Sequence, residues 1–198
     1  MPDPNDTCGD LTASAVAATR AWLHTIVIGE NFCPFAKREF ERNTIQYRVE
    51  HTCLLQSQID AMLDECHKML ADDSIETSLV IFTDSARQGD LNTSQFDNFL
   101  LLIDAVQWAM QRAGFEGELQ LATFHPDYLF EGEAADSPSH YTNRSPYPTL
   151  HLIREASIER VLKTYKMPES IPERNVEHAM KLGTHFFEAF LNSLRTAD

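Results

Sequence analysis

Two short apolar runs in the second half of the chain, 119–125 and 149–154, have the length and composition of β-strands. More than twenty residues, 126–148, lie between them without a helical pattern of their own. Connections in compact domains are usually about 4–6 residues long, and much longer ones are commonly functional. If the two strands pair as antiparallel neighbours, both ends of this connection meet at one edge of a sheet. We therefore expect a candidate site at the ends of this connection.

The rest of the chain alternates between helical and strand patterns. Helical spacing of apolar residues predicts helices that begin near residues 10, 55, 93 and 173, with a shorter one at about 158–162. Alternation over 45–50 predicts a half-exposed strand, and the continuous apolar run 79–82 predicts a central strand. The result is an α/β or α+β domain with a four-stranded mixed sheet packed with helices, in the order α-β-α-β-α-β-β-α-α. The first three strands are expected to run parallel, and the fourth antiparallel beside the third.

Charge and composition narrow the class of protein. The formal net charge is −14, from 16 Lys and Arg against 30 Asp and Glu in 198 residues. Such a surface repels phosphate backbones and anionic lipid headgroups, so we expect no nucleic-acid partner and no membrane partner. No run approaches the roughly 20 apolar residues that span a bilayer. The acidic N-terminus lacks the basic and apolar segments of a signal peptide.

The domain organisation is expected to be simple. Residues 1–9 contain two prolines and a glycine but no periodicity, which predicts a flexible tail, and 10–198 are expected to form a single globular domain. Four cysteines without a CxxC pair are interpreted as reduced thiols, which favours a cytoplasmic location. No cofactor is assigned by any of these patterns.

The ends of the connection 126–148 carry side chains suited to chemistry. His125 with Asp127 can supply acid and base, and Arg144 can hold a carboxylate or a phosphate with two parallel hydrogen bonds. His151 on the following strand is a further catalytic candidate, and the other ligand-binding candidates here are Asn143 and Ser145. The structural alternative is that His125 and Asp127 cap the strand end while Arg144 pins the connection through an ion pair.

The second unusual stretch is Asn31–Lys37, with the sequence NFCPFAK. Pro34 suits the first turn of a short helix, which would place Cys33 at or beside its N-cap. A thiol in that position feels the helix dipole, which lowers its pKa and favours the nucleophilic thiolate, with His125 or His151 as a base. The ligand-binding candidates in this stretch are Asn31 and Lys37. The alternative is that Cys33 is a small buried apolar residue.

A metal site is a further hypothesis. The side chains that could form a set of nitrogen and oxygen ligands for zinc or iron are those of His125, Asp127, His140 and His151. No HxH or HExxH spacing supports such a site.

Three segments of the chain resemble a known family. The segments are NFCPFAK at 31–37, FHPDYLF at 124–130 and NRSPYPTLHLIRE at 143–155. They are similar to the signature segments of small bacterial proteins catalogued as domain of unknown function 1415, and the likeness runs from the first helix to the last. The resemblance implies a single-domain cytoplasmic protein from a proteobacterium, and it brings no catalytic residues with it. It suggests that the family pattern includes Cys33, His125, Asp127, Asn143, Arg144 and His151.

These observations support one leading function and two rivals. The leading hypothesis is a small enzyme or binding protein for a small anionic metabolite, with its site at the strand ends that flank 126–148. Arg144 would anchor the anion, His125 with Asp127 would supply acid and base, and Cys33 would line the pocket or attack. The first rival is a non-catalytic interaction or regulatory module that docks through the long connection. The second is a metal-dependent enzyme with His and Asp ligands.

Overall fold

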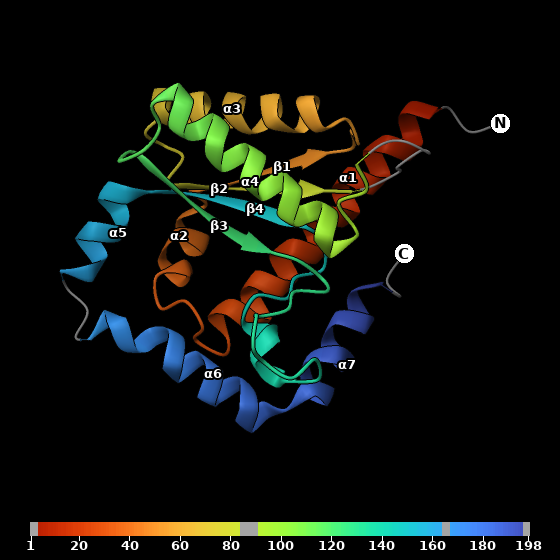
Figure 1. Ribbon diagram of the computed structural model, residues 1–198, viewed down its shortest axis with the longest axis vertical. Coiled ribbons are helices and arrows are strands. Elements are labelled where there is room, and N and C mark those ends of the chain that lie inside the picture. Colours follow the sequence, from red (N-terminus) through yellow and green to blue (C-terminus); the bar gives the residue numbers. More distant parts are fainter. Residues whose placement is uncertain (1–3, 84–90, 164–166, 196–198) are drawn as a thin grey trace.

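A four-stranded mixed sheet with helices on both faces gives the chain an α+β architecture. The computed structural model describes residues 4–83, 91–163 and 167–195 (Figure 1). The strands are β1 (Ile45–Glu50), β2 (Thr77–Phe82), β3 (Leu119–Phe124) and β4 (Thr149–Arg154). The α-helices of the described chain are α1 (Pro4–Trp22), α2 (Ala36–Arg42), α3 (Leu55–Ala71), α4 (Phe96–Ala113), α5 (Glu155–Leu162), α6 (Ile171–Leu182) and α7 (Thr184–Arg195). A π-helix, η1 (Leu23–Ile28), continues α1, and two 3-10 helices are η2 (Pro138–Thr142) and η3 (Pro168–Ser170).

The strands lie in the order β1-β2-β4-β3. β1 and β2 are parallel neighbours, and β4 runs antiparallel to both β2 and β3. β3 therefore has the same direction as β1 and β2, although β4 separates it from them. The predicted mixed sheet of three parallel strands and one antiparallel strand beside the third is confirmed. The position of β4 in the middle of the sheet could not be derived from the sequence.

One face of the sheet packs against α3 and α4. Leu150 and Leu152 of β4 join Val80 and Phe82 of β2 in this layer, and all four are fully buried. β2 is buried along its whole length, which agrees with its continuous apolar sequence and its place between two other strands. This layer holds the larger of the two apolar clusters.

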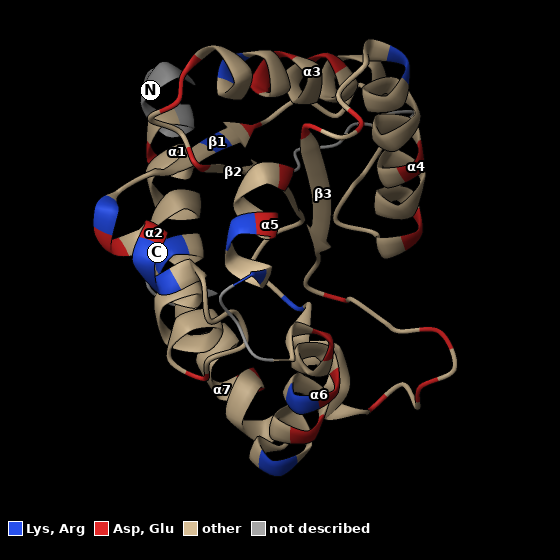
Figure 2. Ribbon diagram, turned by 90° about the vertical axis from the view of Figure 1, so that its left-hand side faces the viewer, with Lys and Arg blue, Asp and Glu red and all other residues tan. Residues whose placement is uncertain are grey.

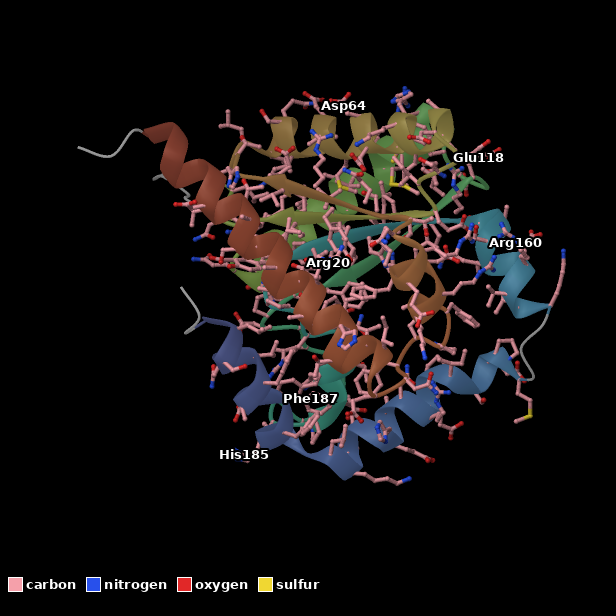
Figure 3. All side chains as sticks on the ribbon, turned by 180° about the vertical axis from the view of Figure 1, so that it is seen from behind. Arg20, Asp64, Glu118, Arg160, His185 and Phe187 are labelled. Atoms are coloured by element: carbon pink, nitrogen blue, oxygen red, sulfur yellow. The ribbon has the colours of Figure 1, made fainter. Side chains whose placement is uncertain are left out.

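The opposite face is covered by α1, η1, η2 and the C-terminal helices. We call this the α1 layer, defined by the buried cluster Trp22, Leu23, Ile26, Val27, Phe32, Leu79, Tyr141, Ala179 and Phe187 and the side chains packed on it. The rings of Tyr141 and Phe187 stack with centroids 4.8 Å apart, which joins η2 to α7. Figure 3 shows this side, with α1 crossing in front of the sheet and α6 and α7 below it. The long connection therefore contributes to the core through η2.

Two helix boundaries differ from the prediction. α1 begins at Pro4, so the segment expected to be a tail is helical from that residue. The helix predicted over 173–195 is two helices, α6 and α7, which meet at Gly183. Gly183 has φ 77° and ψ 158°, a backbone conformation that residues with a side chain rarely adopt. A Cβ at this position would meet no atom within 4 Å, so the glycine serves the bend and not close helix packing.

One helical stretch of the described chain, Gly9–Ile28, is long and apolar enough to span a membrane, contrary to the expectation from the sequence. Its Ala15, Ala18, Trp22 and Ile26 side chains are buried inside the domain. A helix in the core of a soluble protein meets the same criterion of length and composition. One side of this stretch therefore packs inside the domain, and the rest is not buried.

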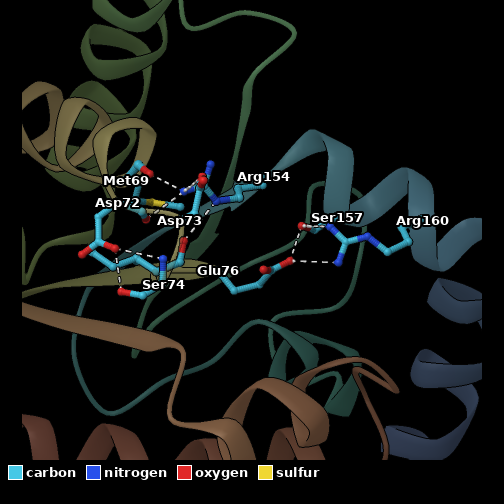
Figure 4. A network of polar contacts seen from close by, with 9 residues as sticks. Met69, Asp72, Asp73, Ser74, Glu76, Arg154, Ser157 and Arg160 are labelled. Carbon is cyan, nitrogen blue, oxygen red and sulfur yellow. Dashed lines mark hydrogen bonds and ion pairs between the residues drawn. The ribbon is translucent and has the colours of Figure 1, made fainter.

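Arg154 ties the end of β4 to the end of α3 (Figure 4). Its guanidinium donates to the backbone carbonyls of Met69 and Asp72 in the last turn of α3. Its Nε donates to the carbonyl of Ile75 at 3.0 Å, just before β2. The last carbonyls of a helix have no partner within the helix, and a cation there also offsets the helix dipole. Arg154 therefore holds α3 against two central strands.

We predict that Arg154→Leu lowers the free energy of unfolding by about 1.5–3 kcal/mol, because hydrogen bonds from a charged group are lost and buried carbonyls lose their partner. Urea denaturation followed by circular dichroism measures this. Arg160→Leu is the matched control, because its 3.7 Å ion pair with Glu76 is on a side chain that is 55% exposed. Such a pair contributes about 0–1 kcal/mol. Equal losses in the two variants would contradict the role of Arg154.

Candidate functional site

The two ends of the connection 126–148 meet, and backbone groups hold them together. The N–H of His125 donates to the carbonyl of Asn143 at 3.1 Å. The side-chain amide of Asn143 donates to the carbonyl of Thr123 at 3.1 Å, and Nε of Arg144 donates to the carbonyl of Tyr128 at 3.2 Å. The connection is therefore closed onto the end of β3, and Asn143 has an architectural task there.

His125 is fully buried, and both of its ring nitrogens contact backbone groups. Nε2 lies 2.9 Å from the carbonyl oxygen of Thr93, so it carries the proton, and Nδ1 accepts from the N–H of Asp127 at 3.0 Å. The ring packs against Phe96 and Phe99 of α4 at 5.1 Å from each. The backbone of Asp127, and not its carboxylate, orients this imidazole. The geometry therefore favours the structural alternative for His125.

His140 repeats this arrangement inside the connection. It is fully buried, its Nε2 lies 2.8 Å from the carbonyl of Ala134, and its Nδ1 accepts from the N–H of Phe130 at 3.1 Å. Within 4–83, 91–163 and 167–195, no group of three or more His, Cys, Asp or Glu side chains is placed to hold a metal ion. The predicted metal ligand set of His125, Asp127, His140 and His151 is therefore wrong. Two of its imidazoles already use both nitrogens on the backbone.

Arg144 and Ser145 have different surroundings although they are neighbours in sequence. The Ser145 hydroxyl is buried and donates to the carbonyl of Tyr147 at 2.6 Å, so it shapes the turn before β4. The Arg144 guanidinium lies 4.5 Å from the centre of the Tyr141 ring. Arg144 forms no ion pair with any carboxylate of the described residues, and it retains a charge that an anion can neutralise.

The segment Asn31–Lys37 is held by α6. Arg174 donates to the carbonyl of Asn31 at 2.6 Å, where Asn31 has a φ of 55°. Asn175 donates to the carbonyl of the next residue, Phe32, at 2.7 Å. Lys37 is exposed on α2 and pairs with Glu41 along the same helix. α6 therefore contacts this segment through backbone carbonyls more than through its polar side chains.

Cys33 lies three residues before α2, whose N-cap is Phe35, so it is not at or beside the N-cap as the sequence predicted. Burial raises the pKa of the Cys33 thiol, and the backbone N–H groups of Phe35 and Ala36 and the charge of Arg174 offset only part of that effect. The expected lowering of the pKa by the helix dipole is therefore outweighed by burial. At neutral pH the thiol is protonated, which does not favour nucleophilic attack.

His151 lies in the middle of β4 on the side of the α1 layer, and its partners determine where its proton sits. The hydroxyl of Thr77 donates to the carbonyl of Leu152 at 2.6 Å, because a carbonyl has no proton to give. The same Thr77 oxygen, 2.5 Å from Nε2 of His151, must then accept from that nitrogen. Burial lowers the pKa of His151 to about 4, so the imidazole is neutral at pH 7. Nδ1 is left as a fixed acceptor, and it has no hydrogen-bond partner among the described residues.

The α1 layer brings together three of the predicted site residues. Cys33 packs directly on its buried cluster, and Arg144 stacks on Tyr141, which belongs to that cluster. His151 stands on the same face of the sheet. His125 lies apart from them against α4. The structure therefore divides the predicted site: Cys33, Arg144 and His151 lie on the side of α1, and His125 lies against α4.

Several polar atoms on this side of the sheet have no partner within the described chain. They are Oγ1 of Thr19, Nε1 of Trp22 and the hydroxyl of Tyr47, and all three are buried. Arg20 lies with its guanidinium 5.2 Å from the centre of the Tyr47 ring and 5.1 Å from that of Phe40 (Figure 3). A buried polar group without a partner costs about 1–3 kcal/mol and requires an explanation such as water or a ligand. The α1 layer therefore contains buried polar atoms that water or a ligand could satisfy.

His51 has a role that was not predicted from the sequence. It follows β1 directly, as Thr83 follows β2, so both lie at the carboxyl ends of parallel strands. Nδ1 of His51 is 2.6 Å from the Thr83 hydroxyl, and Nε2 is 2.8 Å from the hydroxyl of Thr12 on α1. The imidazole therefore joins α1 to the ends of two strands. Polar residues directly after parallel strands are the signal that could have found it.

Other partners could not be found from the sequence. Thr77, which orients His151, is 74 positions away from it in the chain. Tyr141 lies in a segment without helical periodicity, and it becomes important only because η2 packs on α7. Both contacts depend on strand order and helix packing, for which the local sequence has no signal.

We predict a pH effect on stability from His151. Its folded-state pKa of about 4 is below the ordinary value of about 6.5, so the unfolded chain takes up a proton first as the pH falls. The stabilising effect is complete above pH 6.5 and is lost as the pH falls to 4, by up to about 3 kcal/mol. Urea titrations at several pH values measure it. His151→Leu should lose less stability than the wild type over this range, and parallel pH curves for the two proteins would contradict the assignment.

Comparison with known proteins identifies one family. The family model described as "Protein of unknown function (DUF1415)" matches residues 14–189. No curated protein and no solved structure matches the chain.

Proposed function

The chain belongs to the DUF1415 family, described as proteins of unknown function, and we propose that it binds a small anionic metabolite in the α1 layer. The ligand carries a hydroxyl or amine that donates to Nδ1 of His151, and a carboxylate or phosphate that Arg144 holds. This moves the proposed site from the strand ends to the face of the sheet. We place the protein in the bacterial cytoplasm, as the resemblance and the reduced cysteines suggest.

The observation that carries the proposal is the fixed proton of His151. A neutral imidazole with its Nε2–H directed to Thr77 presents its Nδ1 lone pair in one direction only. A fixed acceptor lowers the entropic cost of binding, because the protein does not have to order it when the ligand arrives. A ligand donor at this nitrogen would form a hydrogen bond that no described residue supplies.

Arg144 supplies the charge. A protein with a net charge of −14 repels anions in general, so an arginine without a carboxylate partner is a local exception. Its Nε is engaged by the Tyr128 carbonyl and its plane rests on Tyr141, which together hold the guanidinium in place. The two terminal nitrogens then form a planar fork suited to a carboxylate or a phosphate.

Recognition is the role we propose for this layer, with Cys33 as a lining residue. A protonated thiol is a poor nucleophile, and the raised pKa of Cys33 keeps it protonated at pH 7. An imidazole with a pKa of about 4 is also a weak base at that pH, so His151 is better suited to accept a hydrogen bond than to remove a proton.

A thermal-stability screen against hydroxy- and amino-substituted carboxylates and phosphates tests the proposal. A ligand at 100 times its Kd should add about 2.7 kcal/mol of stability to the wild type. The same ligand should add little to His151→Leu, which lacks the acceptor. A ligand that stabilises both proteins equally binds elsewhere, and that result would refute the assignment of this site.

Arg144→Lys is the second test. We expect a loss of about 1 kcal/mol in folding stability, because the hydrogen bond from Nε to Tyr128 disappears. Ligand affinity should fall at least tenfold, because lysine offers no planar fork. Arg20→Lys is the matched control, since Arg20 also stacks on aromatic rings, but over β1 at the far edge of the sheet. A stability loss of several kcal/mol in Arg144→Lys, with unchanged affinity, would assign Arg144 to architecture.

One observation favours the rival docking function. The side chains of 131–136 are all exposed, and Figure 2 shows this acidic part of the connection standing out from the body of the molecule. Leu129, next to it, is 44% exposed. A protruding acidic segment with an apolar residue suits a basic partner protein. Replacing Glu131 and Glu133 by glutamine should then weaken capture of that partner and leave the ligand screen unchanged.

A further inference from the structure

Helices α3 and α4 lie on the opposite side of the sheet from the α1 layer (Figures 1 and 2), and their surface carries an apolar groove. Its volume is about 510 Å³, and it is lined by Gln56, Ile59, Leu63, Ala105, Trp108, Ala109, Arg112 and Ala113. Trp108 stands at its edge and is 63% exposed. A tryptophan with that exposure beside an apolar groove is typical of a protein–protein contact, where Trp and Arg dominate binding energy.

The solvent side of α4 has a regular pattern around Trp108. Asp97, Leu101, Asp104, Trp108 and Arg112 follow one another at intervals of three and four residues, so they form one stripe along the helix. All five are exposed. Asp104 lies four residues before Trp108 and Arg112 four residues after it. The stripe therefore carries opposite charges at equal distances from the tryptophan.

Neither charge is neutralised within the described chain. Arg112 lies with its guanidinium 5.2 Å from the centre of the Trp108 ring and forms no ion pair with a described carboxylate. Asp104 likewise forms no ion pair with a described cation. An exposed charge does not need a partner. Two opposite charges arranged symmetrically about an exposed Trp nevertheless form a self-complementary pattern.

We propose that two copies of the chain associate through α4, with the two helices antiparallel and a two-fold axis close to Trp108. An antiparallel pairing centred on residue 108 places Asp104 of one copy opposite the partner's Arg112, and the reverse pair forms by symmetry. Each Trp108 then reaches the groove between the partner's α3 and α4. A two-fold contact requires one patch to complement itself, and this stripe does so in charge and in shape. The occupant of the groove is therefore a second copy, on a surface separate from the proposed ligand site.

Charge-reversal variants, compared with the wild type by analytical ultracentrifugation, test the proposal. The measurement is made at about 0.15 M salt, where long-range repulsion between the acidic molecules is screened. The wild type should sediment as a dimer of twice 22.5 kDa, or 45 kDa. Arg112→Asp and Asp104→Arg should each raise the dimer Kd at least tenfold, because like charges then face each other. The double variant Asp104→Arg/Arg112→Asp should return the Kd to within a few-fold of the wild type, because both pairs are restored in reverse.

The variant Trp108→Ala is the second test of the dimer. It should give a monomer with an unchanged circular dichroism spectrum and urea midpoint, since Trp108 is largely exposed and outside the core. The matched control is Leu100→Ala, an exposed apolar residue of α4 outside the stripe, which should leave the dimer intact. A wild type that stays monomeric at its highest soluble concentration would overturn the proposal. A dimer that survives both Trp108→Ala and the single charge reversals would overturn it as well.

Discussion

The position of β4 between β2 and β3 is the constraint on which most of the structure depends. β4 forms ladders on both of its edges, so its backbone is fully used and its side chains alternate strictly between two covered faces. Leu150 and Leu152 enter the layer under α3 and α4, and His151 between them must enter the α1 layer. There it meets Thr77 of the adjacent strand, which fixes its proton, and burial keeps it neutral. At the edge of the sheet the same imidazole would have had a neighbouring strand on one side only.

The same placement explains why the connection before β4 is long and is held by many side-chain to backbone hydrogen bonds. The chain leaves β3, adds η2 to the α1 layer and returns to the neighbouring strand, so many backbone groups lack a ladder or a helix. His125 and His140 each supply one acceptor and one donor to such groups, and Asn143 supplies an amide. Side chains that resemble catalytic residues in the sequence here form hydrogen bonds that hold the backbone of the connection. Polar groups gathered in a long connection therefore support architecture as readily as chemistry.

The sheet separates two surfaces of different character. On the α1 side, unpaired polar atoms and an arginine stacked on a tyrosine are suited to a small polar ligand. On the α3 and α4 side, an exposed tryptophan beside an apolar groove is suited to a macromolecular partner. Because the two surfaces share no residue, occupation of one does not block the other.

The sequence by itself determined the four strands, the position of most helices, the mixed sheet and the meeting of the two ends of the connection. These follow from local periodicity: the alternation over 45–50, the continuous apolar run 79–82 and the helical stripes each record which side of an element is buried. Only the tertiary structure decided the order of the strands, the bend at Gly183 and the partners of each imidazole. The hydrogen-bond partner of the His151 ring, Thr77, is 74 residues away. Burial by distant parts of the chain, which no local pattern encodes, raised the pKa of Cys33 where the helix end alone would have lowered it.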